Sequence, residues 1–387
     1  MIIFAFVMKK LCLFNPENDM ALAYGGPFYK PPVNVCRMGY DLSALPLWYA
    51  PLGSDVWLSD ARQVKWMDTC PFSLGVNGVL GLSPIYNKVS PWGWSASIAR
   101  RLMDEGVDEV CCPSKEQMER IRSLSSRITA VEILGKMDLP DTIGKSQRVD
   151  LIEQCDYHGE MFLLKAPWSG SGRGIQKITC ELSPSMQGWV KHILKTQGCL
   201  IKEPYYNKVV DFAMEFLSDN EGVHWAGYSL FETDVRGIYK ENWLASNDMI
   251  REMLVQYVPE EVLQMISSRL EMLLEEVVDG AYQGYLGVDM MVVRVPEGYV
   301  VHPCVEINLR MNMGVVSRLF YDRYVSPVVQ GRFVIEYYPS PGEALLAHEM
   351  MQRNYPLMME QNKIRQGYMS LTPVFDDTAY QAYVIID

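Results

Sequence analysis

Residues 162–175 read FLLKAPWSGSGRGI, and this stretch decides how the rest of the chain is interpreted. Its first residues are apolar and predict a short buried strand, with Lys165 at the point where that strand ends. The loop that follows contains Ser169, Gly170, Ser171, Gly172 and Gly174 around Arg173. Small residues let backbone N–H groups approach an anion closely, and Arg173 adds a positive charge. The stretch therefore predicts a loop that closes over a polyphosphate, with an ordinary flexible turn and a solvated lysine as the alternative.

Counting residues excludes two common phosphate-binding motifs. A P-loop has the pattern G-x-x-x-x-G-K-[ST], but no lysine follows the glycines of this loop. A Rossmann fingerprint has the pattern G-x-G-x-x-G, and its third glycine would fall on Ile175. The loop must therefore be interpreted together with other parts of the chain.

A second polar cluster lies far downstream, in two runs that both predict strands. The run 284–293, GYLGVDMMVV, contains Asp289, and the run 301–312, VHPCVEINLRMN, contains Glu306, Asn308 and Arg310. Residues two apart on a strand share a face, so the last three side chains point the same way. Two carboxylates and an amide oxygen on neighbouring strands form an all-oxygen site that suits Mg²⁺. A solvated polar face on an edge strand is the alternative interpretation.

In this order, the pieces resemble the ATP-grasp superfamily of carboxylate–amine and related ligases, over roughly residues 113–338. The strand lysine and glycine-rich loop of that family match Lys165 and residues 169–174. The family's metal acids, including its E-x-N motif, match the downstream cluster. The resemblance implies an α/β fold in which two α+β lobes grip ATP together with Mg²⁺ or Mn²⁺. It also implies an N-terminal α/β domain ahead of those lobes.

The resemblance further implies roles for individual residues. The run LIKEPYY at 200–206 matches the hinge between the lobes, where Glu203 and nearby backbone groups would read the adenine. The acid that contacts the ribose most resembles Asp211. Arg127 stands where the family usually has a lysine, and the two side chains differ in geometry. The implied nucleotide-binding set is Arg127, Lys165, Ser169, Gly170, Ser171, Gly172, Gly174, Lys202, Glu203, Tyr205 and Asp211.

The implied reaction is ATP-dependent ligation in two steps. A substrate carboxylate attacks the γ-phosphate to give an acyl phosphate, and an amine or similar nucleophile then displaces the phosphate. The residues implied for catalysis are Lys165, Arg173 and Arg310, and those implied for the metal are Asp289, Glu306 and Asn308. Two alternatives would use the same nucleotide site: a kinase or phosphotransferase that releases a phosphorylated product, and a nucleotide-binding protein without catalysis.

Composition limits the partners. The chain has 387 residues, 49% of them hydrophobic and 21% charged, and a formal net charge of -12. Such a balance predicts a globular protein of two or three domains, and the negative charge argues against binding to nucleic acid or to an anionic membrane. The nine cysteines form no C-x-x-C pair, so we expect reducing cytoplasm. The expected partners are small-molecule carboxylate and amine substrates, with a homodimer left open.

The N-terminal segment predicts a strand, KLCLF at 10–14, followed by a turn and a helix in NPENDMALA at 15–23. The apolar start MIIFAFVMKK lacks the charge order of a signal peptide, and we expect Met8 as an alternative start. Loops after strands line the binding edge of an α/β sheet, so Asp19 or Glu17 could contact a substrate amine; helix capping is the alternative. The loop PWGWS at 91–95 walls a substrate pocket or belongs to the core.

We expect four segments along the chain. Residues 1–112 form the N-terminal α/β domain, 113–200 the first lobe, 201–338 the second lobe with the metal site, and 339–387 a C-terminal segment that packs back on the core. Within the first two segments we expect a strand at 109–112, one helix over 119–137 and another helix over 149–155.

Overall fold

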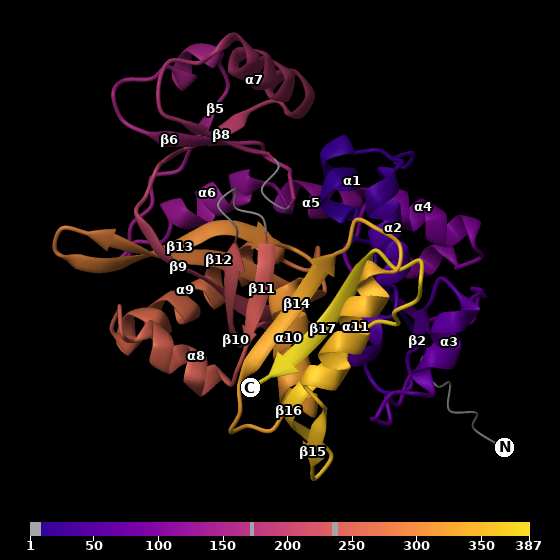
Figure 1. The fold of residues 1–387 in the computed structure, drawn as a ribbon. Helices are drawn as coiled ribbons and strands as arrows, with labels where there is room; N and C mark the ends of the chain where they lie inside the picture. The colour runs from indigo at the N-terminus through magenta and orange to yellow at the C-terminus, as the bar shows by residue number, and fades with distance from the viewer. Residues whose placement is uncertain (1–8, 171–173, 234–238) are drawn as a thin grey trace.

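The computed structural model describes residues 9–170, 174–233 and 239–387, which form three β-sheets with helices around them (Figure 1). The N-terminal sheet has four parallel strands in the order β3-β2-β1-β4. Its strands are β1 (Lys10–Leu13), β2 (Asp55–Trp57), β3 (Asn77–Val79) and β4 (Lys88–Pro91). Its helical elements are α1 (Asn18–Tyr24), α2 (Val33–Asp41), η1 (Leu45–Trp48), α3 (Ala61–Met67) and α4 (Ala96–Asp104).

The predicted strand, turn and helix at the start of the chain are confirmed by β1 and α1. Because β1 and β4 are parallel neighbours, the loops NPEND and PWGWS leave the sheet at the same edge. The two loops are joined by hydrogen bonds, since the Asn15 side-chain amide donates to the carbonyl of Gly93 at 2.9 Å. Both loops therefore belong to one surface of the molecule.

A small antiparallel sheet carries the glycine-rich loop and stands apart at one end of the molecule (Figure 1). Its strands, in the order β5-β8-β6-β7, are β5 (Gln147–Val149), β8 (Leu200–Pro204), β6 (Phe162–Lys165) and β7 (Ile175–Ile178). The long helix α7 (Pro184–Gln197) packs on it, and Leu164, Val190 and Leu200 are fully buried between them. This unit has its own hydrophobic core.

Three expectations about local structure were wrong. Residues 109–111 form a 3-10 turn, η2 (Glu109–Cys111), because the Asp108 side chain caps its first turn. Residues 149–155 divide into the end of β5 and a second 3-10 turn, η3 (Ile152–Cys155). The long helix is two helices, α5 (Lys115–Leu124) and α6 (Arg127–Gly135), because Ser126 leaves the helical conformation and its hydroxyl accepts the N–H of Ile128.

The largest sheet has nine strands in the order β13-β12-β9-β10-β11-β14-β17-β16-β15, and every neighbouring pair is antiparallel. Its first five strands along the chain are β9 (Lys208–Asp219), β10 (Gly222–Thr233), β11 (Tyr239–Leu244), β12 (Gly284–Val295) and β13 (Gly298–Asn308). The remaining strands are β14 (Gly331–Tyr337), β15 (Met358–Glu360), β16 (Lys363–Ser370) and β17 (Tyr380–Ile386). The last strands of the chain therefore extend the sheet that begins at β9, although the domain boundaries stay a prediction.

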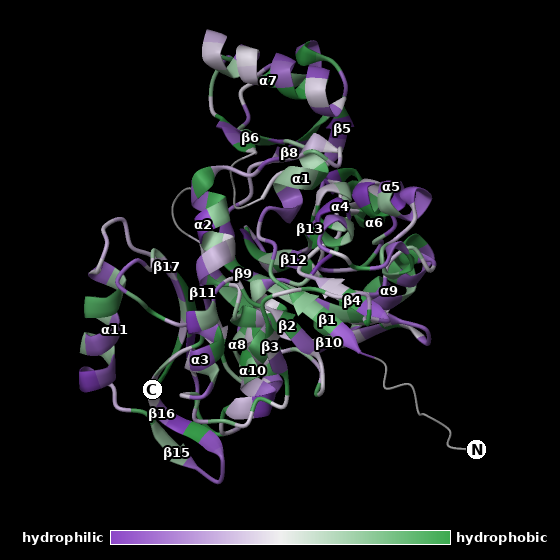
Figure 2. Cartoon of the chain, turned by 90° about the vertical axis from the view of Figure 1, so that its right-hand side faces the viewer, coloured by the Kyte–Doolittle hydropathy of each residue, from purple (hydrophilic) through white to green (hydrophobic). Residues whose placement is uncertain are grey.

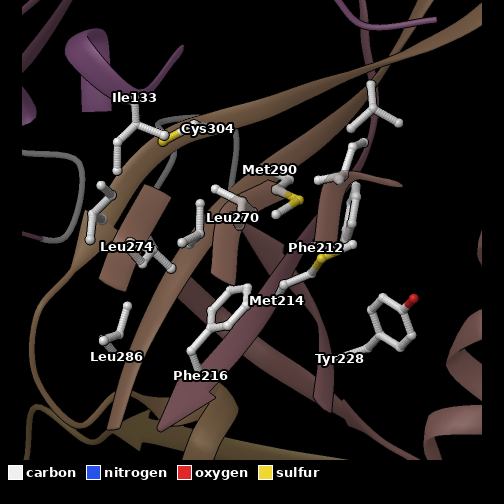
Figure 3. Close-up of a cluster of buried hydrophobic side chains, with 14 of the residues drawn as sticks. Ile133, Phe212, Met214, Phe216, Tyr228, Leu270, Leu274, Leu286, Met290 and Cys304 are labelled. Carbon is white, nitrogen blue, oxygen red and sulfur yellow. The ribbon is translucent and has the colours of Figure 1, made fainter. Parts of the chain in front are cut away.

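Period-two alternation along β9 and β12 divides this sheet into an apolar face and a polar face. The apolar face packs on α6 and α9 (Glu260–Val278), with α8 (Asn247–Leu254) beside them. Figure 3 shows the resulting core, in which side chains of β9 such as Phe212 and Phe216 meet Leu270 and Leu274 of α9. The intervening residues of the same strands, including Glu215 and Asp289, must point to the opposite face.

The opposite face is covered by α10 (Met313–Tyr324), and α11 (Glu343–Asn354) packs on β16. The N-terminal domain joins this second core, because Trp48 of η1 contacts Phe320 and Tyr324 of α10 edge to face. The Trp48 indole N–H also donates to the carbonyl of Leu371 at 2.6 Å. The N-terminal and C-terminal parts of the chain therefore share one core.

Replacing Trp48 by alanine is expected to lower the free energy of unfolding by about 3–5 kcal/mol, because a fully buried aromatic side chain is lost from the shared core. Urea unfolding followed by circular dichroism measures the change. Leu346→Ala is the matched control, since that side chain is 67% exposed. Equal stabilities of the two variants would contradict this account of the core.

The distribution of hydropathy agrees with this arrangement of the cores. Figure 2 shows apolar residues concentrated around β1 and β10 in the middle of the molecule, and mixed colouring on peripheral helices such as α11. Mixed colouring is typical of helices that pack one face and expose the other. Within the described residues, no helix combines the length and the hydropathy needed to span a membrane.

Candidate functional site

Lys165 and Glu203 form a buried ion pair at the base of the small sheet. β6 ends with Lys165, and its Nζ lies 2.6 Å from Oε1 of Glu203 on the neighbouring strand β8. The two side chains are 3% and 2% exposed. Burial would raise the pKa of Glu203, but the Lys165 ammonium and His302 outweigh it and hold that pKa well below its ordinary value. The carboxylate is therefore ionised and paired.

Arg127 connects the glycine-rich loop to the large sheet. As the first residue of α6 it is 4% exposed, and its Nη1 donates to the carbonyl of Ala166 at 2.7 Å and to the Ser169 hydroxyl at 2.6 Å. Its Nη2 donates to Oε2 of Glu306 at 2.6 Å. One guanidinium thus binds both the glycine-rich loop and an acid of the large sheet. The donors are spread over two nitrogens, so Nη1 binds the loop while Nη2 binds Glu306.

The three residues predicted to hold a metal lie together on β12 and β13. Asp289 and Glu306 are directly opposite in the register, and the Asn308 amide donates to Oδ2 of Asp289 at 3.1 Å. Burial raises the pKa of Asp289 well above its ordinary value, and the nearby carboxylates of Glu306 and Glu215 raise it further. The protein alone therefore disfavours the ionised form of Asp289, and a cation bound beside it would favour that form.

Arg310 lies just beyond the end of β13 and binds the N-terminal domain. Its Nε and Nη2 donate to the two carboxylate oxygens of Asp19, each at 2.8 Å. Asp19 is in the first turn of α1, so the NPEND loop reaches the same site as the metal acids. Of the two acids that the sequence proposed for this loop, the structure brings Asp19 to the site, whereas Glu17 has Arg101 as its charged neighbour.

The glycine-rich loop is folded tightly where it is described. A Cβ on Gly174 would lie 2.3 Å from the Ser169 side chain, and one on Gly170 would lie 2.8 Å from Oδ2 of Asp19. Only glycine fits both positions without movement of a neighbour. The predictions for Ser171, Gly172 and Arg173 fall outside the described residues.

The structure does not bring every predicted nucleotide residue into this cluster. The Lys202 ammonium lies over the Phe162 ring and donates to the carbonyl of Gln154 at 2.9 Å, so its side chain faces away from Glu203. Asp211 on β9 forms an ion pair with Lys208 and accepts a hydrogen bond from the Thr233 hydroxyl at 3.1 Å. Tyr205 follows β8, is 44% exposed, and carries the Lys177 ammonium over its ring.

Glu215 is a buried acid that the motif search missed. It lies on β9 in register with Gly287, on the same face as Asp289, and its Oε2 accepts the Asn312 amide at 2.8 Å. A Cβ on Gly287 or on Gly314 would lie within 2.5 Å of its carboxylate. Two glycines therefore make room for one acid. The sequence did contain one signal for it. In VVDFAMEF, Glu215 is an acid two positions from Ala213, so the two residues share one face of the strand.

His302 on β13 was also missed. Its ring is completely buried, and neither ring nitrogen has a hydrogen-bond partner within the described residues, although Nε2 lies 3.4 Å from Oε2 of Glu203. The Tyr206 ring packs edge to face against it. The His302 side chain therefore lies between β13, which carries it, and Glu203 of β8.

Glu215 gives a prediction for pH dependence. Burial raises the pKa of Glu215, and the hydrogen bonds from Asn312 and Ser229 lower it. Burial has the larger effect, so the pKa is raised to about 7. The folded state therefore binds this proton more tightly than the unfolded state, and stability falls as the pH rises from the ordinary carboxyl range towards 7. Glu215→Gln removes this loss. From pH 5 to pH 8, the free energy of unfolding of the variant is therefore expected to rise by on the order of 2–3 kcal/mol relative to that of wild type. Urea unfolding at both values measures it; a difference that does not change with pH would contradict the shift.

Several of the residues described above line a small pocket. Its lining includes Asp19, Trp168, Ser169, Glu306, Asn308 and Arg310. These residues come from α1, the glycine-rich loop and the end of β13, three places that are far apart in the sequence. With Asn18, which also lines it, the pocket combines two carboxylates, two amides and a guanidinium.

Comparison with known proteins adds information about the fold. No family model and no curated protein matches the sequence. Among solved structures, the complex of biotin carboxylase with β-γ-ATP from Campylobacter jejuni matches with a TM-score of 0.53 and 12% identity, over 99% of this chain and 88% of that one. Pyruvate carboxylase from Rhizobium etli matches with a TM-score of 0.52 and 10% identity, over 98% of this chain and 36% of that one.

Both of these structures belong to ATP-grasp proteins. The chain has the ATP-grasp fold with an N-terminal α/β domain, which confirms the fold predicted from the sequence. At these identities the likeness shows the fold alone, so the activity has to be argued from the site.

Proposed function

We propose that the chain is an ATP- and Mg²⁺-dependent ligase that activates a carboxylate as an acyl phosphate and passes the acyl group to an amine or similar nucleophile. The observation that carries the proposal is the contact of Arg127 with both Ser169 of the glycine-rich loop and Glu306 beside Asp289. A triphosphate between these elements would meet positive charge from one lobe and metal ligands from the other. The biotin carboxylase that shares the fold was solved as a complex with β-γ-ATP.

The donor set fits Mg²⁺. No group of three or more His, Cys, Asp and Glu side chains among the described residues is arranged to hold a metal ion. The site instead offers the carboxylates of Asp289 and Glu306 and the amide of Asn308. Mg²⁺ commonly takes only one or two carboxylates, with phosphate oxygens and waters completing its shell. When bound, the ion would neutralise charge on the phosphates and on Asp289.

The protein's own residues then have distinct roles. Lys165 would turn partly away from Glu203 and contact a phosphate. Arg127 would hold the loop over the nucleotide. Arg310 would stabilise the negative charge that develops on the acyl group. Such preorganised contacts typically contribute about 3–4 kcal/mol each to transition-state stabilisation.

Trapping of the acyl phosphate tests the proposal. The protein is incubated with MgATP, hydroxylamine and a panel of amino acids and other small carboxylic acids, and ADP, phosphate and hydroxamate are measured. We expect acid-dependent ADP release that EDTA abolishes, together with a hydroxamate. A stable phosphate ester on a substrate hydroxyl, formed without hydroxamate, would show a kinase. ADP binding without any ADP release would show a nucleotide-binding protein without catalysis.

A further inference from the structure

The pocket contains an ion pair that joins two distant parts of the chain. Asp19 and Arg310 are 291 residues apart, and Arg310 donates two parallel hydrogen bonds of 2.8 Å to the two oxygens of Asp19. Their side chains are 24% and 17% exposed, and both line the pocket. The pocket volume is about 10 Å³, so a ligand reaches these groups only by separating the pair.

The surrounding structure fixes both members of the pair. The Arg310 Nη1 donates to the carbonyl of Met311, and the Met311 N–H donates to the carbonyl of Trp92 in the PWGWS loop at 2.9 Å. On the other side, Gly170 of the glycine-rich loop approaches Asp19 so closely that a Cβ there would lie 2.8 Å from Oδ2. A carboxylate and a guanidinium are thus held side by side next to Glu306 and Asn308.

A ligand that carries one positive and one negative group can replace this pair with two pairs of its own. An ammonium would take the place of the guanidinium on Asp19, and a carboxylate would take the place of Asp19 on Arg310. A ligand with only one charge would leave either Asp19 or Arg310 without its partner in a partly buried place, which is unfavourable. The geometry therefore favours a zwitterion.

We propose that this pocket takes a zwitterionic substrate, an amino acid, with Asp19 binding its ammonium group and Arg310 its carboxylate. The Asp19–Arg310 ion pair is then the ligand-free arrangement of a substrate site. This inference rests on the proposed function, because the carboxylate held by Arg310 is the one that would be phosphorylated beside Glu306. It identifies the acid substrate by class and makes Asp19 a specificity-determining residue.

Calorimetric titration tests the inference. The protein is first titrated with MgADP and then, at saturating MgADP, with each of the common proteinogenic amino acids. For the amino acids that bind, the N-acetyl and carboxamide derivatives are titrated in the same way. We expect at least one amino acid to bind, and loss of either charged group to weaken binding about tenfold or more.

Asp19→Asn is expected to weaken binding of the same amino acid about tenfold or more without changing the Kd of MgADP. Glu17→Gln is the matched control, because it removes one negative charge from the same turn of the chain away from Arg310. The derivatives test the claim in the wild-type protein, so the result does not depend on how the variant folds.

The outcomes separate the two proposals. Failure of MgADP to bind would overturn the proposed function itself. If MgADP binds and no amino acid does, or if the N-acetyl derivative binds as well as its parent, the zwitterion inference is overturned while the nucleotide site stands. An amino acid that binds Asp19→Asn as tightly as wild type would also overturn it.

Discussion

Glu306→Ala is expected to lower MgATP turnover by about two orders of magnitude or more while the protein stays folded. The carboxylate lies opposite Asp289 and accepts a hydrogen bond from Arg127, so its loss removes a metal ligand and frees the guanidinium that ties the glycine-rich loop to the large sheet. ADP release measures the effect, and circular dichroism checks the fold. Arg127 is 4% exposed and loses one ion pair in this variant, but its Nη1 keeps the hydrogen bonds to Ala166 and Ser169, so we expect a less stable protein that still folds.

Glu297→Ala is the matched control for this variant. Glu297 is an exposed acid on the same β12–β13 hairpin, far along the strands from the Arg127 contact. Its turnover is expected to equal that of wild type. A folded Glu306→Ala protein with wild-type turnover would remove Glu306 from the site.

Lys165→Met is expected to abolish turnover and also to destabilise the protein by about 3–5 kcal/mol, because the Glu203 carboxylate is left buried without its ammonium partner. The double variant Lys165→Met/Glu203→Gln removes that charge and is expected to recover most of the stability but none of the turnover. Urea unfolding and ADP release measure the two properties separately. Recovery of turnover in the double variant would show that Lys165 serves only the ion pair.

The stability effect of Lys165→Met depends on pH with a defined sign. The pKa of Glu203 is held below its ordinary value in the folded protein, so its contribution to stability is present above the ordinary carboxyl pKa and is lost as the pH falls through the folded value. The difference between wild type and Lys165→Met should therefore shrink when unfolding is measured in increasingly acidic buffer. A difference that grows on acidification would contradict the pairing.

The sequence predicted the strands that carry this site better than it predicted the contacts between their side chains. Alternation in VVDFAMEF and GYLGVDMMVV predicts strands, and the E-x-N spacing predicts that Glu306 and Asn308 share a face, because both follow from local backbone geometry. The fold was predicted from the resemblance that these pieces, in their order along the chain, bear to ATP-grasp proteins. Short apolar runs at 109–112 and 149–155 were misassigned, since so few residues do not distinguish a strand, a helix and a 3-10 turn.

Long-range contacts left no local signal. The hydrogen bond from Arg127 to Glu306 spans 179 residues, and the one from Arg310 to Asp19 spans 291. Their partners depend on how the three sheets are placed, which no spacing rule encodes. Glu215 could have been noticed as an acid among apolar residues, but its place beside Gly287 and Gly314 became visible only when β9, β12 and α10 were assembled.

The most direct test of this account is a crystal structure of the protein with Mg²⁺ and a non-hydrolysable ATP analogue. The account predicts that the triphosphate lies between the glycine-rich loop and the large sheet, with Lys165 contacting a phosphate and Asp289 and Glu306 bound to the ion. A nucleotide bound elsewhere, or one that contacts Lys165 while the ion lies away from Glu306, would contradict the claim that these two parts of the chain form one site.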